Sequence, residues 1–152
     1  MQEGKIHVRL RMVIIKNNKL LCSYTQKNDF YFYIGGHLEF GETIEEGCKR
    51  EIEEECGKET KFKFQKILYV RDFIEIKENE HSVELFILGK VNNFEKLEGR
   101  LDSQHPNGDM WLSWLPINNL PNNLYPKELT ERLLTDYKTG FKDTQKYLGK
   151  IK

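Results

Sequence analysis

Apolar and polar residues alternate near the start of the chain. Every second position from 6 to 14 is apolar, and the positions between them include His7, Arg9 and Arg11. A period of two is typical of a β-strand with one buried face. Residues 16–19 contain two adjacent asparagines, which tolerate positive φ. A tight turn is therefore expected there, and residues 20–24 are predicted to return as the second strand of a hairpin.

Aromatic and β-branched residues mark the strands expected further along. Residues 30–33 form a short aromatic run that leads into Gly35 and Gly36. Paired glycines allow the backbone to turn sharply and to approach a ligand closely. Residues 61–76 and 83–91 predict two longer strands, which we expect to be antiparallel neighbours.

The last third of the chain predicts a loop, a strand and a helix. Residues 92–109 are polar and without a period, so we expect a long loop, and loops of that length are often functional. Residues 111–115 indicate a short strand. Residues 126–137 indicate a helix that begins at a proline and is followed by Gly140. The Lys-rich last dozen residues are expected to fray.

A further helix is predicted between the aromatic run and the long strands. Its apolar residues recur at i, i+4 and i+8: Ile44, Cys48 and Ile52. Thr43 and Glu46 have the spacing of a capping box at its start, and Gly57 is expected to end it. Strands on either side of this helix, and a second helix near the end, predict a mixed sheet covered on both faces.

Length and composition indicate one domain over residues 1–152, with a core from about 5 to 140. The chain has 24 acidic and 24 basic residues, which argues against a protein that mainly holds nucleic acid. The cysteines lack C-x-x-C spacing and are typical of reduced thiols: Cys22, Cys48 and Cys56. No secretion signal or membrane span is evident. We expect a cytoplasmic monomer or homodimer.

Glutamates crowd the segment from Glu51 to Glu55. On an α-helix, Glu51, Glu54 and Glu55 occupy positions i, i+3 and i+4 and share a face, whereas Glu53 points away. Three carboxylates on one face repel one another unless a cation lies between them. Oxygen ligands without Cys or His suit Mg²⁺ or Mn²⁺, and magnesium commonly completes its shell with substrate phosphate oxygens. The residues therefore indicate phosphate chemistry.

Residues 36–58 resemble the Nudix box, the signature of the Nudix (MutT-type) hydrolases. Eight positions match the pattern: Gly36, Glu42, Arg50, Glu51, Ile52, Glu54, Glu55 and Gly57. Lys58 departs from it, because the box ends in an aliphatic residue. The resemblance implies the Nudix fold, an α/β/α sandwich with a mixed β-sheet. It also implies an enzyme, a divalent-metal-dependent pyrophosphohydrolase acting on acid anhydrides.

The resemblance also implies roles for the residues of the box. The ligands of Mg²⁺ or Mn²⁺ are expected to be the main-chain carbonyl of Gly35 and the carboxylates of Glu51, Glu54 and Glu55. A metal-bound water would attack phosphorus, and Glu54 or Glu51 would most simply take its proton. The base differs among family members, so Asp102 and Asp109 in the long loop remain candidates.

Other residues of the segment are expected to support this site. Arg50 is expected to orient the glutamates, with Glu42 as its partner. Gly36 and Gly57 are expected to provide the turn before the helix and its end. Glu45, Glu46 and Glu53 have the ordinary interpretation of a solvated helix face, the first two favouring the amino end of the helix.

Contacts to the substrate are less well marked in the sequence. His37 and Asp109 could contact the substrate, and Tyr31 and Tyr33 are expected as exposed aromatics that could do the same. A lone histidine beside a turn is also often a passive neighbour. Trp111 and Trp114 fit the core better than a nucleobase platform. Specificity is expected outside the box, in the aromatic run and in the loop of residues 92–109.

The substrate class is not fixed by the sequence. A proline and a tyrosine that mark two Nudix subfamilies would fall near Phe73, Glu75 and Ile76, and neither is present. Ile34 also replaces a common proline before the glycines. A nucleoside triphosphate is favoured, with ADP-ribose or a nucleotide sugar as the alternative. Processing of RNA 5′ ends, which needs a basic track such as the tail after Lys138, and a non-catalytic nucleotide-binding domain also stay open.

Overall fold

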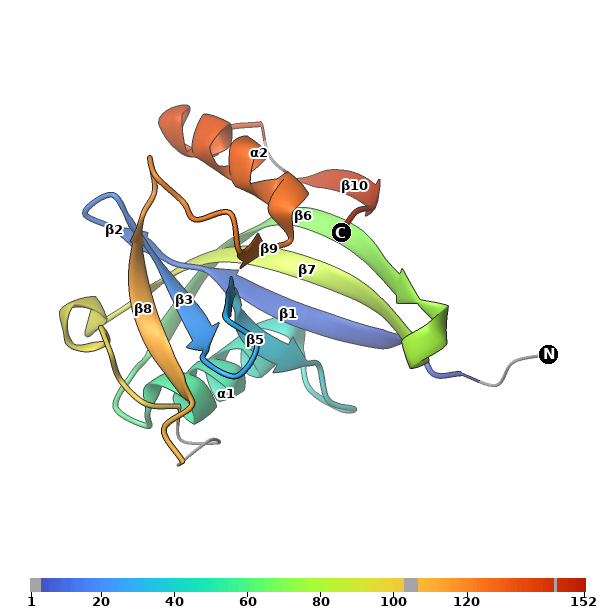
Figure 1. Ribbon diagram of the computed structural model, residues 1–152, viewed down its shortest axis with the longest axis horizontal. Coiled ribbons are helices and arrows are strands. Elements are labelled where there is room, and N and C mark those ends of the chain that lie inside the picture. Colours follow the sequence, from blue (N-terminus) through green and yellow to red (C-terminus); the bar gives the residue numbers. More distant parts are fainter. Residues whose placement is uncertain (1–3, 103–106, 144) are drawn as a thin grey trace.

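The computed structural model describes residues 4–102, 107–143 and 145–152 (Figure 1). Its strands are β1 (His7–Val13), β2 (Ile15–Lys16), β3 (Lys19–Thr25), β4 (Phe30–Phe32), β5 (Ile34–His37), β6 (Phe62–Glu75), β7 (Glu80–Val91), β8 (Met110–Pro116), β9 (Leu124–Tyr125) and β10 (Lys146–Lys150). Its helices are α1 (Ile44–Cys56) and α2 (Lys127–Lys138), with short 3₁₀ turns η1 (Ile76–Glu78) and η2 (Phe94–Lys96).

The larger sheet is mixed and has the strand order β10-β6-β7-β1-β5. β1 runs parallel to β7 and antiparallel to β5, so it lies next to the glycine strand. The alternation in β1 divides its side chains between the two faces, as the sequence predicts. Leu10 and Met12 are buried in the core beside α1, whereas Arg9 and Arg11 are only partly covered. β1 therefore places apolar side chains on the α1 side of this sheet and two arginines on the other side.

The smaller sheet contains the predicted hairpin. Asn17 and Asn18 have φ of 54° and 60° at the turn between β2 and β3, as expected for residues that tolerate the left-handed region. β3 also pairs antiparallel with β8 and with β4, and β4 continues to β9. The short strand expected at residues 111–115 is thus confirmed as part of β8.

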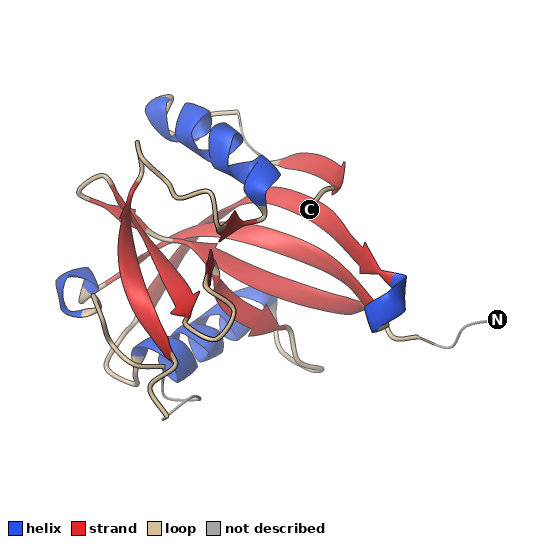
Figure 2. Ribbon diagram, in the orientation of Figure 1, coloured by secondary structure: helices blue, strands red, loops and turns tan. Residues whose placement is uncertain are grey.

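The two helices cover opposite faces of the larger sheet. Figure 2 shows α1 on one side of the long strands and α2 on the other. Cys48 and Ile52 of α1 are buried with Leu10, and Leu129 of α2 is buried in the second core cluster with Phe86. This arrangement is an α/β fold with a mixed sheet between helices, the class that the sequence predicts.

The termini of α1 follow the expected signals. Thr43 has extended backbone dihedrals, and its hydroxyl accepts a hydrogen bond from the Glu46 amide at 3.1 Å. Gly57 ends the helix with φ 104°, and its N–H donates to the Glu53 carbonyl. The capping residue and the glycine stop therefore fix where the acidic segment lies along the helix.

The structure of the aromatic run, residues 30–33, differs from its prediction. Residues 30–33 do not form a single strand, because β4 belongs to the smaller sheet and β5 to the larger one. Tyr33 lies at the crossing between the sheets and is 1% exposed, with its ring edge-on to Phe86 at 5.4 Å. The prediction of an exposed Tyr33 was wrong, because this crossing places the ring in the core.

Three other predictions, for Ile6, the long loop and the C-terminal tail, also need correction. Ile6 is 63% exposed and precedes β1 instead of belonging to its buried face. The long loop contains the turn η2, in which Phe94 is buried, so it is anchored to the core. The tail was expected to fray, yet β10 pairs parallel with β6. The prediction of a frayed tail was based on its lysine-rich composition and was wrong. The edge of β6 supplies backbone hydrogen-bond partners that order this strand.

Candidate active site

The three glutamates expected to share a face of α1 are brought together. Glu51 and Glu55 are 8% and 7% exposed, and Glu54 is half-buried. Glu53 faces elsewhere and accepts a hydrogen bond from Nζ of Lys61 at 3.0 Å. Glu53 is therefore paired locally with Lys61, whereas Glu51 and Glu54 share contacts with Arg50 and Glu55 is buried close to Glu51.

Arg50 connects these carboxylates to the loop before the helix. Its Nε and NH2 donate to the two oxygens of Glu42 at 3.0 and 2.7 Å, which is a bidentate pair. Its NH1 donates to Glu51 at 2.9 Å and to Glu54 at 3.3 Å, and NH2 also donates to the His37 carbonyl at 2.9 Å. The hydrogen bonds from Arg50 hold the pKa of Glu42 below its usual value. One planar side chain thus fixes three carboxylates and the end of β5.

Gly35 and Gly36 allow the close approach between β5 and its neighbours. A Cβ on Gly35, whose φ is 150°, would lie 1.7 Å from the Leu10 carbonyl oxygen. A Cβ on Gly36 would lie 2.6 Å from a carboxylate oxygen of Glu51. The space that any side chain would take at Gly36 is thus occupied by the Glu51 carboxylate.

The buried carboxylates are electrostatically unsatisfied. Burial raises the pKa of Glu55 well above its usual range, and the charge of Glu51 raises it further. Burial also raises the pKa of Glu51, although its hydrogen bond with Arg50 acts in the opposite direction. Among the described residues, the buried Oε2 atom of Glu55 has no hydrogen-bond partner. A cation placed beside these oxygens would favour their charged forms.

The donor set therefore fits a divalent ion. Its oxygens are carboxylates and a main-chain carbonyl, which are the ligands that Mg²⁺ and Mn²⁺ prefer. No three His, Cys, Asp or Glu side chains among the described residues already stand as a metal shell. The cation that Glu51 and Glu54 contact is instead the guanidinium of Arg50.

The two aspartates of the long loop are placed differently. Asp102 is 3% exposed, and its charge raises the pKa of Glu55, so it lies close to the glutamate cluster. Asp109 lies beside the smaller sheet, where its carbonyl accepts the amide of Gln26 at 2.9 Å. Nothing in the described part of the chain links Asp109 to the box glutamates. Geometry therefore favours Asp102 over Asp109 as a residue of this site.

His37 is held by its neighbours. Its Nε2 accepts a hydrogen bond from Nε of Arg9 at 3.0 Å, and its ring stacks on His7 with centroids 4.4 Å apart. Partial burial, Arg9 and His7 lower the pKa of His37. The His37 ring thus belongs to a cluster with His7 and Arg9 of β1. Its carbonyl, in contrast, accepts the hydrogen bond from Arg50 and so lies next to the site.

The other aromatic candidates lie on the smaller sheet. The half-buried ring of Tyr31 packs on Tyr24 at 4.7 Å, and Tyr24 packs on Trp111 at 5.0 Å. Trp114 stacks on the buried Phe94 at 5.3 Å. Trp114 therefore belongs to the core, as predicted, whereas Tyr31 and Trp111 form a partly exposed cluster.

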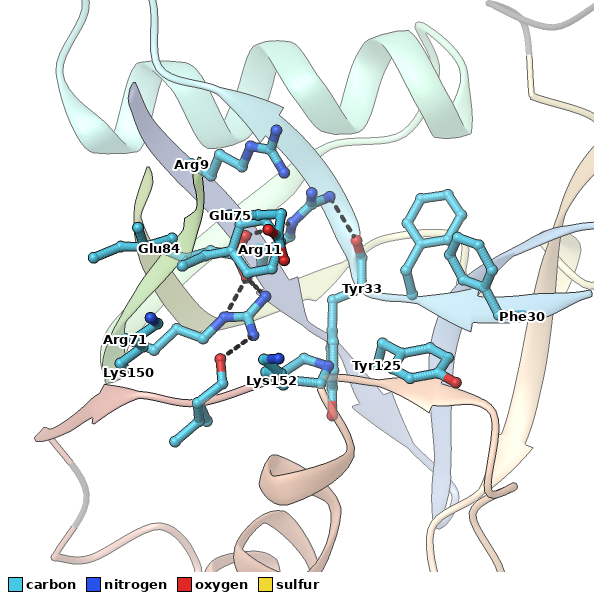
Figure 3. Close-up of a pocket in the computed structure, with 15 residues that line it drawn as sticks. Arg9, Arg11, Phe30, Tyr33, Arg71, Glu75, Glu84, Tyr125, Lys150 and Lys152 are labelled. Carbon is cyan, nitrogen blue, oxygen red and sulfur yellow. Dashed lines mark hydrogen bonds and ion pairs between the residues drawn. The ribbon is translucent and has the colours of Figure 1, made fainter. Parts of the chain in front are cut away.

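A cavity of about 650 Å³ lies on the charged face of the larger sheet (Figure 3). Four of the residues that line it are aromatic side chains with exposed or half-buried rings: Phe30, Phe32, Phe73 and Tyr125. Five are basic: Arg9, Arg11, Arg71, Lys150 and Lys152. Aromatic faces and cations in a cavity of this size are suited to a planar, anionic ligand.

This cavity was not predicted from the sequence. The signal was present in the polar positions of β1, where two arginines follow one another on the same face next to the paired glycines. The contribution from β6 and β10 could not be found, because it depends on which strands lie side by side.

Arg11 joins the cavity to the glycine strand. Its NH1 donates to the carbonyls of Tyr33 and Gly35 at 3.1 and 3.3 Å, and its Nε lies 3.6 Å from Glu84. Glu84 also accepts from Nε and NH2 of Arg71 at 3.0 and 2.8 Å (Figure 3). The box glutamates do not themselves line the cavity. Arg11 is therefore the residue that both regions share.

The chain thus combines an α/β sheet, an acidic helix, a glycine strand and a basic cavity. A sequence model of the NUDIX domain matches residues 6–135, and the chain belongs to the Nudix family. Enzymes of this family hydrolyse pyrophosphate bonds of small nucleotide substrates and generally use divalent metal ions.

Solved structures support the fold. The chain is similar to a MutT Nudix hydrolase from Burkholderia pseudomallei, with 23% identity and a TM-score of 0.68 over 87% of this chain and 98% of that one. It is also similar to a UDP-X diphosphatase, with 21% identity and a TM-score of 0.68 over 97% and 69% of the two chains. An ADP-ribose pyrophosphatase from Streptococcus suis has 18% identity and a TM-score of 0.64 over 93% and 97%.

Neither described helix has the length and apolar character that a bilayer crossing requires.

Proposed function

We propose that this protein is a divalent-metal-dependent pyrophosphohydrolase that cleaves a nucleoside diphosphate linked to another group, with a nucleoside triphosphate as the favoured substrate. The observation that carries the proposal is the buried pair of Glu51 and Glu55. Both have raised pKa values, and one oxygen of Glu55 has no hydrogen-bond partner in the part of the chain that the structure describes. Such a pair is costly unless a cation completes it.

The residues that would hold Mg²⁺ or Mn²⁺ are Glu51, Glu54, Glu55 and the carbonyl of Gly35. The chemistry that a bound ion supplies is neutralisation of the pyrophosphate and a lower pKa for a coordinated water. The Gly35 carbonyl already accepts from Arg11 and has a second lone pair. Arg11 would thus orient this carbonyl from the cavity side.

The general base is proposed among three carboxylates. Glu54 and Glu51 both lie within reach of Arg50, which fixes their orientation. Asp102 is the third candidate because it is buried close to Glu55. Arg50 acts as a positioning residue in this scheme, since its contacts are to protein acceptors and it does not line the cavity.

The nucleoside would occupy the cavity on the sheet. Stacking against the rings of Phe30, Phe32 and Tyr125 suits a nucleobase, and the nearby arginines suit its phosphates. An ADP-ribose or nucleotide-sugar substrate is the second candidate, because a cavity of about 650 Å³ extends beyond these rings to β10. Processing of RNA 5′ ends is less favoured, because the Lys-rich tail folds onto the sheet through β10.

The test is a substrate screen with purified protein and Mg²⁺ or Mn²⁺. Nucleoside triphosphates, ADP-ribose, nucleotide sugars, dinucleoside polyphosphates and capped RNA are compared by released phosphate or pyrophosphate. Glu54→Gln and Glu55→Gln should each remove most of the activity, and Glu53→Gln should not, because Glu53 faces Lys61. Full turnover in excess chelator, or equal loss in all three variants, would contradict the proposal.

A further inference from the structure

The last strand, β10, forms part of the cavity although it lies outside the family match. The NUDIX match ends at residue 135, whereas β10 spans Lys146–Lys150. Three consecutive residues at its end line the cavity: Lys150, Ile151 and Lys152. The cavity therefore contains a wall that lies outside the residues matched by the family model.

This wall is attached to the buried charge network. The carbonyl of Ile151 accepts a hydrogen bond from NH1 of Arg71 at 3.0 Å (Figure 3). Arg71 is 8% exposed, and its remaining guanidinium nitrogens donate to Glu84. The end of β10 is therefore held against the floor of the cavity, and its lysines are carried by an ordered segment.

The three arginines of the cavity are already engaged by protein acceptors. Arg9 contacts His37 and Glu80, Arg11 contacts the carbonyls of β5, and Arg71 contacts Glu84 and Ile151. The side-chain amines of Lys150 and Lys152, in contrast, have no hydrogen bond or ion pair with the part of the chain that the structure describes. Among the basic side chains that line the cavity, these two lysines are therefore the ones without a protein acceptor in the described residues.

The lysines stand far from the proposed cleavage site. β5, which carries Gly35, is one edge strand of the larger sheet, and β10 is the other. Four strand spacings of about 4.8 Å separate them, or roughly 19 Å in all. A pyrophosphate near Gly35 would thus place its nucleoside over the middle of the sheet, and only a group on the far side of that nucleoside would approach β10.

We propose that Lys150 and Lys152 bind a second phosphate group on the far side of the nucleoside, so that the preferred substrates are pyrophosphates whose ribose also carries a 2′- or 3′-phosphate. The lining residues include five basic and only two acidic side chains, and one of the acids, Glu84, is taken up by arginines. The other, Glu75, would oppose an anion. The inference rests on the proposed function in one respect, namely that the pyrophosphate is cleaved near Gly35.

The test measures binding without turnover. AMP, adenosine 2′,5′-bisphosphate and adenosine 3′,5′-bisphosphate are titrated by calorimetry into the protein with Mg²⁺. At least one bisphosphate should bind about tenfold more tightly than AMP, since two charge-assisted contacts are added. The double variant Lys150→Ala/Lys152→Ala should reduce this ratio to near one.

A matched double variant controls for overall charge. Lys142 and Lys146 are exposed lysines of the same segment that do not line the cavity. Lys142→Ala/Lys146→Ala should keep the tenfold preference, and Glu75→Gln should increase it. The inference is overturned if neither bisphosphate binds more tightly than AMP, or if both double variants lose the preference equally.

The substrate screen separates this inference from the proposed function. Preference for a bisphosphate without hydrolysis of any pyrophosphate would remove the proposed function and leave the lysine site intact. Hydrolysis without that preference would do the reverse.

Discussion

Replacing Arg50 with lysine tests how far the site depends on one planar side chain. Arg50 donates both hydrogen bonds of a bidentate pair to Glu42 and further bonds to Glu51, Glu54 and the His37 carbonyl. Lysine keeps the charge but offers a single nitrogen, so the fork to Glu42 cannot coexist with the contact to Glu51. At least two charge-assisted bonds are lost.

The size of the effect follows from these bonds. Each charge-assisted hydrogen bond contributes about 1.5–3 kcal/mol, and partial replacement by the ammonium offsets some of that loss. We expect a decrease of about 2 kcal/mol in the free energy of unfolding, which lowers Tm by roughly 4–8 °C for a chain of this length. The carboxylates would shift, and a displacement of 1 Å near the reacting atoms can reduce kcat about 100-fold.

Steady-state kinetics and thermal unfolding measure both effects. KM should change little, because Arg50 does not line the cavity. Lys49→Arg is the control, since Lys49 forms only an exposed pair with Glu45 at 3.6 Å and should retain both rate and Tm. An Arg50→Lys variant with the parent's kcat would refute the positioning role. A rise in KM with unchanged kcat would instead place Arg50 in contact with the substrate.

Three other predictions can be checked directly. Tyr125→Ala should raise KM about tenfold or more with little change in Mn²⁺ affinity, because its ring lines the cavity where the nucleobase would stack. Tyr147 does not line the cavity, and Tyr147→Ala should leave KM unchanged. An unchanged KM in Tyr125→Ala would remove Tyr125 from the substrate site. Shortening the loop between Ser103 and Gly108 should change the preferred substrate but not Mn²⁺ affinity; Ser103 lies outside the described residues. An equal loss of rate on every substrate, together with weaker metal binding, would place the loop in the catalytic centre. The three buried thiols, Cys22, Cys48 and Cys56, should resist iodoacetamide at pH 8 in the folded protein and react when it is unfolded, as measured by mass spectrometry. The reason is that burial raises their pKa, that of Cys48 to about 12. Rapid labelling of the folded protein would contradict this prediction.

Local signals made much of the fold predictable. The period of two in β1, the asparagine turn and the caps of α1 each depend on residues that lie close together in the chain. The shared face of the α1 glutamates was predictable for the same reason, since helical spacing places Glu51, Glu54 and Glu55 on one face. The pairing of Arg50 with Glu42 was expected from the resemblance to the Nudix box. The family match over residues 6–135 agrees with this prediction of the fold.

Features that depend on distant strands were not predictable. Tyr33 was expected on the surface because an aromatic run looks continuous, yet the chain changes sheets there and buries the ring. The cavity combines Arg11 with Arg71, which pair through Glu84, and no local pattern links these residues. The tail was judged by composition, whereas its structure is decided by the backbone partners on β6.

The pairing of β10 with β6 has a consequence for solubility. β6 is a strand of 14 residues that would otherwise form the border of the larger sheet, with open N–H and C=O groups along Tyr69–Asp72. Long uncovered borders of this kind recruit strands from other molecules. β10 occupies those groups and places exposed lysines outermost, where like charges on two approaching molecules repel. We therefore expect the same short strand that completes the cavity also to limit self-association through this edge of the sheet.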